Sequence, residues 1–136
     1  KSLPIYGDGK NIRDWLYVSD HCNAIEKVLD KGVCGETYNI GGNCELTNLE
    51  VVTEICNSLD HLRPKKVGSY LDQIEYVSDR LGHDRRYAIN AEKIKNNLAW
   101  KPIETFESGL KKTIEWYLEN PKWVKSIESG QYLKNR

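Results

Sequence analysis

Arg13 lies in a run of residues that combines side chains suited to burial with a permanent positive charge. The run from Ile12 to Val18 is rich in aromatic and branched residues, which is typical of a β-strand, and the glycine-punctuated turn Gly7–Lys10 precedes it. A guanidinium in such surroundings needs an anionic partner. The residue types leave two partners open, namely a structural carboxylate such as that of Asp14 and a phosphate group of a ligand.

Two further segments carry polar groups that suit an anion. The loop of residues 79–87 contains Arg80, whose planar guanidinium suits phosphate oxygens, and Asn48 lies in the first turn of a helix that a Thr-x-x-Glu capping box predicts. The amide donors and the dipole at a helix N-terminus favour an anion. The alternative is an ordinary solvated ion network in the loop, with Asn48 assisting the cap.

The residues do not predict a dinucleotide site or a catalytic pair. Gly7-x-Gly9 has no third glycine, and no helix is expected to follow it. Tyr6 and Lys10 have the Tyr-x-x-x-Lys spacing of a catalytic pair, but a helix there would lose about 1 kcal/mol for each intervening glycine. His21, a lone histidine near a helix start, is interpreted as structural. We therefore expect no catalytic residue and no cofactor-binding residue in this chain.

The composition is that of an ordinary globular protein. The 136 residues are 39% hydrophobic and 29% charged with zero net charge, which disfavours nucleic acid or an anionic membrane as the main partner. No apolar run has membrane-spanning length, and no signal peptide is visible. The cysteines lack a C-x-x-C pair, so no metal site is predicted, and we expect reduced, mostly buried thiols of a cytoplasmic protein. They are Cys22, Cys34, Cys44 and Cys56.

The hydrophobic pattern predicts a small mixed α/β unit with three to five short strands, whose sheet is too small for a complete Rossmann domain. The predicted strands include Ile5–Tyr6, Ile12–Val18, Thr37–Ile40 and Ile74–Val77. Four helices are predicted, from a Ser19 N-cap to Lys31, from Thr47 to Leu62, from an Asn90 cap to Leu98 and, as the longest, from Glu104 to Asn120. A terminal helical segment is expected to begin at Pro121, and residues 131–136 are expected to fray.

Several ordered motifs together resemble the C-terminal lobe of the dTDP-glucose 4,6-dehydratases, which belong to the extended short-chain dehydrogenase/reductase superfamily. The resemblance covers nearly the whole chain, and one departure is Leu81, where the family commonly has proline. The matching motifs are YGDGKNIRDWLYV (6–18), GETYNIGG (35–42), TNLEVV (47–52), DRLGHDRRYAI (79–89), WKP (100–102), ETFESG (104–109) and KTIEWY (112–117).

The resemblance implies a substrate-binding lobe, residues 1–136, that belongs to a longer chain with an N-terminal NAD-binding Rossmann domain. The family oxidises the sugar at C4, eliminates water across C5 and C6, and returns the hydride to C6. The acid, the base and the Tyr/Lys pair would lie in the N-terminal part, so the lobe alone is expected to be inactive and to expose apolar surface. The full-length enzyme is expected to be a cytoplasmic homodimer that acts on a dTDP-sugar.

The resemblance also implies which residues bind the substrate. The strand before the glycine turn would pair with and cover the base, and Arg13 and Arg80 would bind the pyrophosphate. The matching positions are Pro4, Ile5, Tyr6, Arg13, Asn48, Asp79, Arg80 and His83. Two alternatives stay open, namely another nucleotide-sugar epimerase, dehydratase or decarboxylase acting on a UDP-sugar, and a non-catalytic sugar-nucleotide-binding module.

Overall fold

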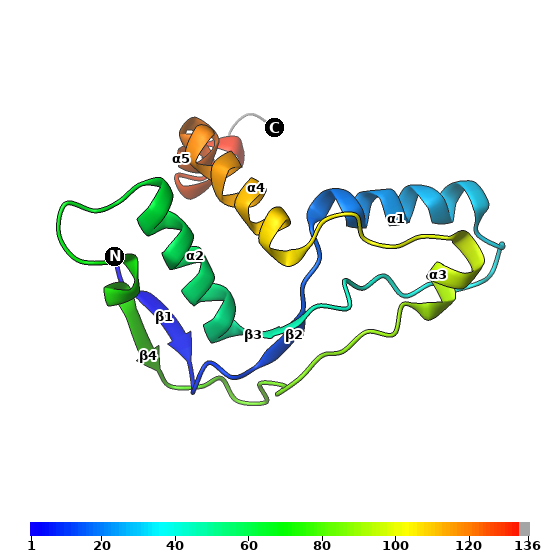
Figure 1. Ribbon diagram of the computed structural model, residues 1–136, viewed down its shortest axis with the longest axis horizontal. Helices are drawn as coiled ribbons and strands as arrows, with labels where there is room; N and C mark the ends of the chain where they lie inside the picture. The colour runs from blue at the N-terminus through cyan, green and yellow to red at the C-terminus, as the bar shows by residue number, and fades with distance from the viewer. Residues whose placement is uncertain (134–136) are drawn as a thin grey trace.

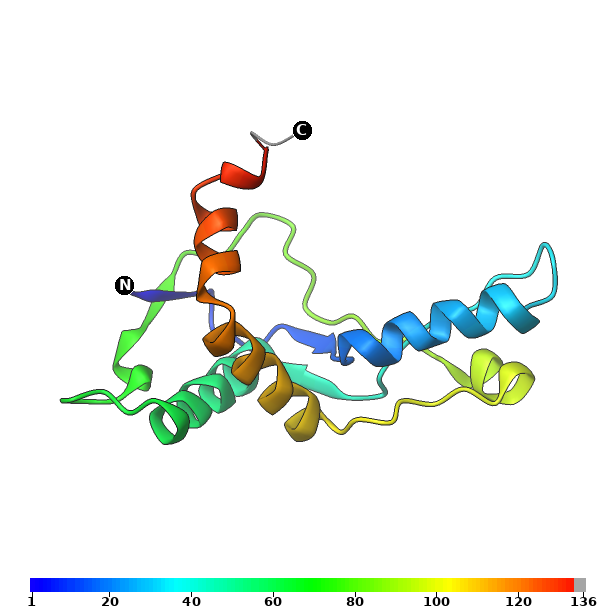
Figure 2. The ribbon, with the colours of Figure 1, turned by 90° about the horizontal axis from the view of Figure 1, so that it is seen from above.

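The computed structural model describes residues 1–133, which form two helical ends joined by long extended segments (Figure 1). At one end, helix α1 (Val18–Lys31) lies beside α3 (Glu92–Leu98), and Figure 2 shows the same arrangement from above. The other end contains α2 (Asn48–Leu62), α4 (Phe106–Glu119) and α5 (Pro121–Glu128), with the 3-10 turns η1 (Tyr70–Gln73) and η2 (Gln131–Leu133). The four short strands are β1 (Leu3–Tyr6), β2 (Ile12–Asp14), β3 (Glu45–Thr47) and β4 (Ile74–Val77).

The strands form two small pairs. β1 and β4 are parallel, and β2 and β3 are antiparallel with Ile12 opposite Thr47. The free edge of β2 carries a third segment, because the Ile12 N–H donates to the Arg85 carbonyl at 2.8 Å and the Tyr87 N–H donates to the Ile12 carbonyl at 3.1 Å. The predicted small mixed α/β class is confirmed, and the bridge brings residues 85–87 against β2.

The turn between β1 and β2 is a tight glycine turn. Gly7 and Gly9 have φ angles of +59° and +70°, a region that disfavours side chains. A Cβ on Gly9 would lie 2.8 Å from Cγ2 of the buried Ile5, and the Gly9 carbonyl accepts the Leu49 N–H at 2.9 Å. The turn therefore fixes β1 against the start of α2.

The structure confirms one predicted helix cap and corrects another. The Thr47 hydroxyl accepts the Glu50 N–H at 3.2 Å, and the Glu50 carboxylate accepts the Thr47 N–H at 2.8 Å. Ser19 is not the N-cap of α1, because the His21 N–H already bonds the Tyr17 carbonyl and helical pairing begins at Val18.

The buried carboxylate of Asp20 bonds residues that are distant in sequence and does not cap its own helix. It accepts the N–H groups of Ile103 and Glu104 at 3.1 and 3.0 Å, which fastens α1 to the segment that leads into α4.

Thr105 caps α4 by accepting the Ser108 N–H, so α4 begins at Phe106. The longest helix of the described residues is α2. The predictions that a helix starts at Glu104 and that it is the longest were wrong.

Residues 37–40 do not form the predicted strand. No strand within residues 1–133 lies beside this segment, although Tyr38 and Ile40 pack on the core of α1 and α3. That core consists of Ala24, Ile94, Leu98 and Trp100. The side chains of residues 37–40 therefore pack as those of a strand would, but their backbone does not hydrogen-bond to a neighbouring strand of residues 1–133.

The remaining predictions are confirmed in part. The Asn90 side chain accepts the Glu92 N–H at 2.8 Å, although α3 itself begins at Glu92. The four cysteines are free thiols, but Cys22 and Cys34 are exposed, so the expectation of mostly buried thiols was wrong. Pro121 begins α5 as predicted, which gives five α-helices in the described residues, whereas Gln131–Leu133 form η2 and residues 134–136 lie outside them. None of the helices within residues 1–133 is long and apolar enough to cross a membrane.

We expect Gly9→Ala to destabilise the protein more than Gly35→Ala. Both glycines have a positive φ, where a side chain costs about 1–2 kcal/mol, but Gly35 has open space around it. Gly9→Ala adds an overpacking cost of about 1–3 kcal/mol against Ile5. Denaturant unfolding of both variants measures the difference, and equal losses would show that the contact with Ile5 is not a constraint.

Candidate functional site

Residues 79–87, here called the arginine loop, are fastened to the rest of the fold by two paired arginines. Arg85 donates to both carboxylate oxygens of Asp8 at 2.8 and 3.2 Å. Arg86 donates to both carboxylate oxygens of Glu45 at 2.6 and 2.8 Å. Such two-pronged pairs are geometrically specific, so they hold the loop to the glycine turn and to β3.

Arg13 lies at the same junction but has no carboxylate partner among residues 1–133. Its Nη1 donates to the Ile12 carbonyl at 2.6 Å, its Nη2 donates to the Asp84 carbonyl at 3.1 Å, and its guanidinium lies 4.4 Å from the centre of the Tyr87 ring. A structural carboxylate was one of the two partners predicted for Arg13, and this alternative was wrong.

The Asp14 carboxylate faces a different segment. It accepts the N–H groups of Gly42 and Cys44 at 2.8 and 2.7 Å, and a Cβ on Gly42 would clash with the Trp15 carbonyl oxygen. Asp14 therefore closes the turn that precedes β3, which leaves the charge of Arg13 without a counterion in the described part of the chain.

Asn11 is a buried polar residue at this junction. Its side chain is 2% exposed, and its Nδ2 donates to the Asp84 carbonyl at 3.3 Å, the same oxygen that Arg13 uses. Its backbone carbonyl accepts the Asn48 N–H at 3.0 Å, and its Oδ1 has no partner among the described residues. The side chain of Asn11 thus contacts the arginine loop and its backbone carbonyl contacts the start of α2, directly before β2 begins.

Arg80 forms a second cluster with Tyr6, Asp79 and His83. Its guanidinium lies 5.0 Å from the centre of the Tyr6 ring, and its Nη2 lies 3.0 Å from His83 Nε2. A guanidinium only donates, so Nε2 accepts and His83 carries its proton on Nδ1, which lies 2.6 Å from the Asp79 carboxylate. The bond from His83 holds the pKa of Asp79 below its ordinary value.

Within this cluster Arg80, Tyr6 and Asp79 are exposed, with the Asp79 side chain at 44%. The His83 side chain is only 5% exposed, and the Asp79 carboxylate is engaged by the His83 ring and by the Arg80 N–H at 2.8 Å. A Cβ on Gly7 would lie 2.8 Å from Asp79 Oδ2, so the glycine turn also fixes Asp79. Asp79 and His83 therefore orient Arg80 in this arrangement.

The other predicted site residues lie near these clusters with different accessibility. Ile5 is 4% exposed, so a ligand would reach only its backbone, whereas Pro4 and Tyr6 are exposed. Asn48 is half-buried at the start of α2. The structure thus brings all eight predicted positions to β1, β2, the start of α2 and the arginine loop.

The backbone amides at the start of α2 are not open to an anion. The Asn48 N–H bonds the Asn11 carbonyl, the Leu49 N–H bonds the Gly9 carbonyl at 2.9 Å, and the Glu50 N–H bonds the Thr47 hydroxyl. The prediction that these amide donors favour an anion was therefore wrong, and only the side chain of Asn48 remains to contact one.

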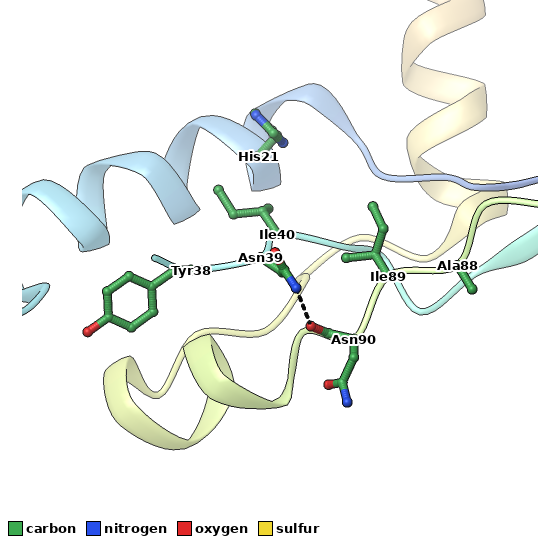
Figure 3. A pocket seen from close by; sticks show the side chains of 7 residues that line it. All are labelled: His21, Tyr38, Asn39, Ile40, Ala88, Ile89 and Asn90. Carbon is green, nitrogen blue, oxygen red and sulfur yellow. Dashed lines mark hydrogen bonds between the residues drawn. The ribbon is translucent and has the colours of Figure 1, made fainter. Parts of the chain in front are cut away.

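Two hollows lie elsewhere in the described structure. One hollow of about 500 Å³ lies between the extended segments 38–40 and 88–90. Figure 3 shows His21 above these segments and the hydrogen bond from Asn39 to the Asn90 carbonyl. This bond from Asn39 Nδ2 is 3.4 Å long. A larger groove of about 870 Å³ lies between α2, α4 and residues 15–19 and is lined mainly by apolar side chains. None of the eight predicted site residues lines either hollow.

The described residues do not fit an NAD site. The glycine turn leads into strand β2 and its Gly9 carbonyl is taken by Leu49, whereas a dinucleotide fingerprint requires a turn into a helix. Tyr6 ends β1 and Lys10 lies in the turn, so the two side chains do not share a helical face. No group of His, Cys, Asp or Glu residues within residues 1–133 could hold a metal ion.

Solved structures define the class of protein. The chain is similar to dTDP-glucose 4,6-dehydratase from Bacillus anthracis in complex with NAD, at 57% identity and a TM-score of 0.76 over 90% of this chain and 36% of that chain. The enzyme from Streptomyces venezuelae with NAD and dTDP bound gives 42% identity and a TM-score of 0.80 over 90% and 35%. UDP-glucose 4-epimerase from Thermotoga maritima is 28% identical, with a TM-score of 0.69 over 88% of this chain and 35% of that chain. The fold is the small α/β lobe of extended short-chain dehydrogenases/reductases.

The sequence comparisons define the family. The family model described as GDP-mannose 4,6 dehydratase matches residues 1–113, and the chain belongs to this family. It is 61% identical to dTDP-glucose 4,6-dehydratase 1 of Escherichia coli (strain K12) over 132 residues, which are 97% of this chain and 36% of the relative. The chain is 56% identical to a dTDP-glucose 4,6-dehydratase of Xanthomonas campestris over 98% of this chain and 38% of the relative. The resemblance seen in the sequence is confirmed, and the chain spans little more than a third of these relatives.

Sequence reasoning missed the residues that hold the arginines in place. Asp8, Glu45 and Asn11 lie far in sequence from the arginine loop, and no local spacing connects them with Arg85, Arg86 or Asp84. The only local signal was the excess of arginine in the loop, which indicates that some guanidinium groups need partners elsewhere.

We expect the pKa of Asp8 to depend on Arg85. The hydrogen bond from Arg85 lowers this pKa from 3.8 to about 2, so the bond stabilises the folded protein above pH 4 and its contribution is lost as the pH falls through about 2. NMR titration should show the pKa returning toward 3.8 in Arg85→Gln. An unchanged pKa in that variant would mean that Arg85 does not hold Asp8 in solution.

Proposed function

We propose that this chain is the C-terminal, substrate-binding part of a dTDP-glucose 4,6-dehydratase, a lyase that converts dTDP-glucose to dTDP-4-keto-6-deoxyglucose. The observation that carries the proposal is the unequal pairing of the arginines at one junction. Arg85 and Arg86 have carboxylate partners, whereas Arg13 and Arg80 have none among residues 1–133. Two such guanidinium groups suit the two negative charges of a pyrophosphate.

The surrounding residues supply the rest of the binding site in this proposal. The strand Pro4–Tyr6, in which Pro4 and Tyr6 are exposed, covers the base with its backbone and with the Tyr6 ring, and the Asn48 side chain contacts the nucleotide sugar. The family resemblance implies that Asp79 and His83 contact the substrate. In this proposal they act through Arg80, because their polar groups already bond each other and Arg80. Binding energy from the nucleotide positions the sugar for the reaction.

The chemistry itself belongs to residues outside this chain. In the proposed enzyme, NAD bound by an N-terminal Rossmann domain supplies the oxidation and the reduction. NAD is named in the complexes of the Bacillus anthracis and Streptomyces venezuelae enzymes, and the glycine turn of this chain does not fit it. The role of residues 1–136 is therefore to bind and orient the substrate, in a cytoplasmic homodimer as the resemblance implies.

One face of α1 supports a Rossmann-domain partner. Val18, Cys22, Ile25 and Leu29 recur at intervals of three and four residues and are all exposed, with Leu29 at 83%, whereas Ala24 on the other face is buried. An apolar helical stripe of this kind normally faces a core. The chain covers 36% of its Escherichia coli relative, so the proposed occupant is the N-terminal remainder of the same protein.

Arg13→Ala and Arg80→Ala in the full-length protein should each raise the dissociation constant for dTDP by about one to two decades. A hydrogen bond to a charged partner contributes about 1.5–3 kcal/mol, and lysine should restore little because it lacks the planar fork. Isothermal titration with dTDP measures the change, and Arg63→Ala, an exposed arginine at the end of α2, is the matched control.

Thermal unfolding of the same variants separates the alternatives. Lost stability with unchanged dTDP affinity would mean that Arg13 and Arg80 are structural. UDP titrated beside dTDP tests the second candidate, a UDP-sugar enzyme, which the likeness to UDP-glucose 4-epimerase favours. Tighter binding of UDP than of dTDP would replace the proposed substrate with a UDP-sugar.

Leu29→Glu should destabilise the full-length protein, whereas Val67→Glu should not. Both side chains are more than four-fifths exposed here, but only Leu29 belongs to the stripe that the Rossmann domain is proposed to cover, where burial of a leucine contributes about 1.5–3 kcal/mol. Denaturant unfolding of the two variants measures the difference. Similar stabilities would mean that α1 faces solvent in the whole protein.

A further inference from the structure

We propose that Tyr87 is a positioning residue that holds Arg13 in the orientation required for a phosphate group. The inference rests on the proposed function, because it assigns the ligand of Arg13 to the pyrophosphate of a nucleotide sugar. It assigns to Tyr87 a role through Arg13, without contact between the tyrosine and the ligand. The geometry of three neutral contacts around the guanidinium carries it.

The Tyr87 ring is fixed at both of its ends. Its backbone N–H donates to the Ile12 carbonyl at 3.1 Å, which places Tyr87 beside the strand that carries Arg13. Its hydroxyl donates to the Asp84 carboxylate within the arginine loop, and this bond raises the pKa of Tyr87 above its ordinary value. The ring face is therefore a fixed surface against which the guanidinium lies at 4.4 Å.

The contacts of Arg13 orient its charge without neutralising it. The carbonyl oxygens of Ile12 and Asp84 accept from Nη1 and Nη2, and the aromatic face attracts the cation through its quadrupole. A guanidinium has five N–H donors, so donors remain for a ligand. Arg85 and Arg86, in contrast, have both prongs bound to a carboxylate, which leaves Arg13 as the cation of β2 that is ready for an anion.

Holding the guanidinium in advance should increase affinity because less side-chain freedom is lost on binding. Without the ring, the Arg13 side chain would keep only its two carbonyl contacts and could turn away from the ligand. The loss should appear for ligands that carry phosphate and not for the nucleoside alone. A tyrosine that merely packs in the fold would change the affinity for both ligands or for neither.

The test is a double-mutant cycle in the full-length protein with Tyr87→Leu, Arg13→Ala and the double variant. Isothermal titration measures dTDP binding, competition measures thymidine binding, and thermal unfolding reports folding. Tyr87→Phe keeps the ring and Tyr87→Gln is a second variant without it. Tyr132→Leu, a half-exposed tyrosine in η2, is the matched control.

Tyr87→Leu and Tyr87→Gln should weaken dTDP binding about three- to tenfold, the range expected for loss of a cation–π contact. Tyr87→Phe should retain more of the affinity, thymidine binding should not change, and the double variant should bind dTDP no more weakly than Arg13→Ala alone. Additive losses in the double variant, or equal losses for dTDP and thymidine, would overturn the inference. If Arg13→Ala itself leaves dTDP binding unchanged, the proposed function fails at Arg13 independently of Tyr87.

Discussion

The backbone bridge between Ile12 and the arginine loop is the constraint on which the rest of the site depends. Two hydrogen bonds, from the Ile12 N–H to the Arg85 carbonyl and from the Tyr87 N–H to the Ile12 carbonyl, attach a charged loop to the edge of β2. The ion pairs of Arg85 and Arg86 also hold the loop, but exposed ion pairs on their own contribute little to stability. The bridge brings the Asp84 carbonyl and the Tyr87 ring to Arg13.

The arginines at this junction differ in whether they have a carboxylate partner. Asp8 and Glu45 satisfy Arg85 and Arg86, while neutral or engaged groups surround Arg13 and Arg80. The arrangement leaves two guanidinium groups without a carboxylate partner among residues 1–133, although the chain has zero net charge.

Local signals in the sequence predicted the local features of the fold, such as the Thr47 capping box, the strand Ile74–Val77 and the proline that begins α5. Features that depend on distant partners were missed. Asp20 bonds residues more than eighty positions away in place of supporting a cap at Ser19. Residues 37–40 have the side-chain pattern of a strand, but a strand also needs a neighbour, which residues 1–133 do not supply. The proposed ligand positions followed from family motifs, whereas the contacts of Asp8, Glu45, Asn11 and Tyr87 depend on residues that are distant in sequence.

The central claim is that Arg13, held by neutral contacts at this bridge, binds the pyrophosphate of a nucleotide sugar. A crystal structure of the full-length protein with dTDP tests it most directly, through the distance from the Arg13 guanidinium nitrogens to the phosphate oxygens. The account predicts a charge-assisted hydrogen bond of about 2.7–2.9 Å with the Tyr87 ring still against the guanidinium. A bound dTDP whose phosphates lie away from Arg13, with Arg13 paired instead to a carboxylate of the protein, would contradict it.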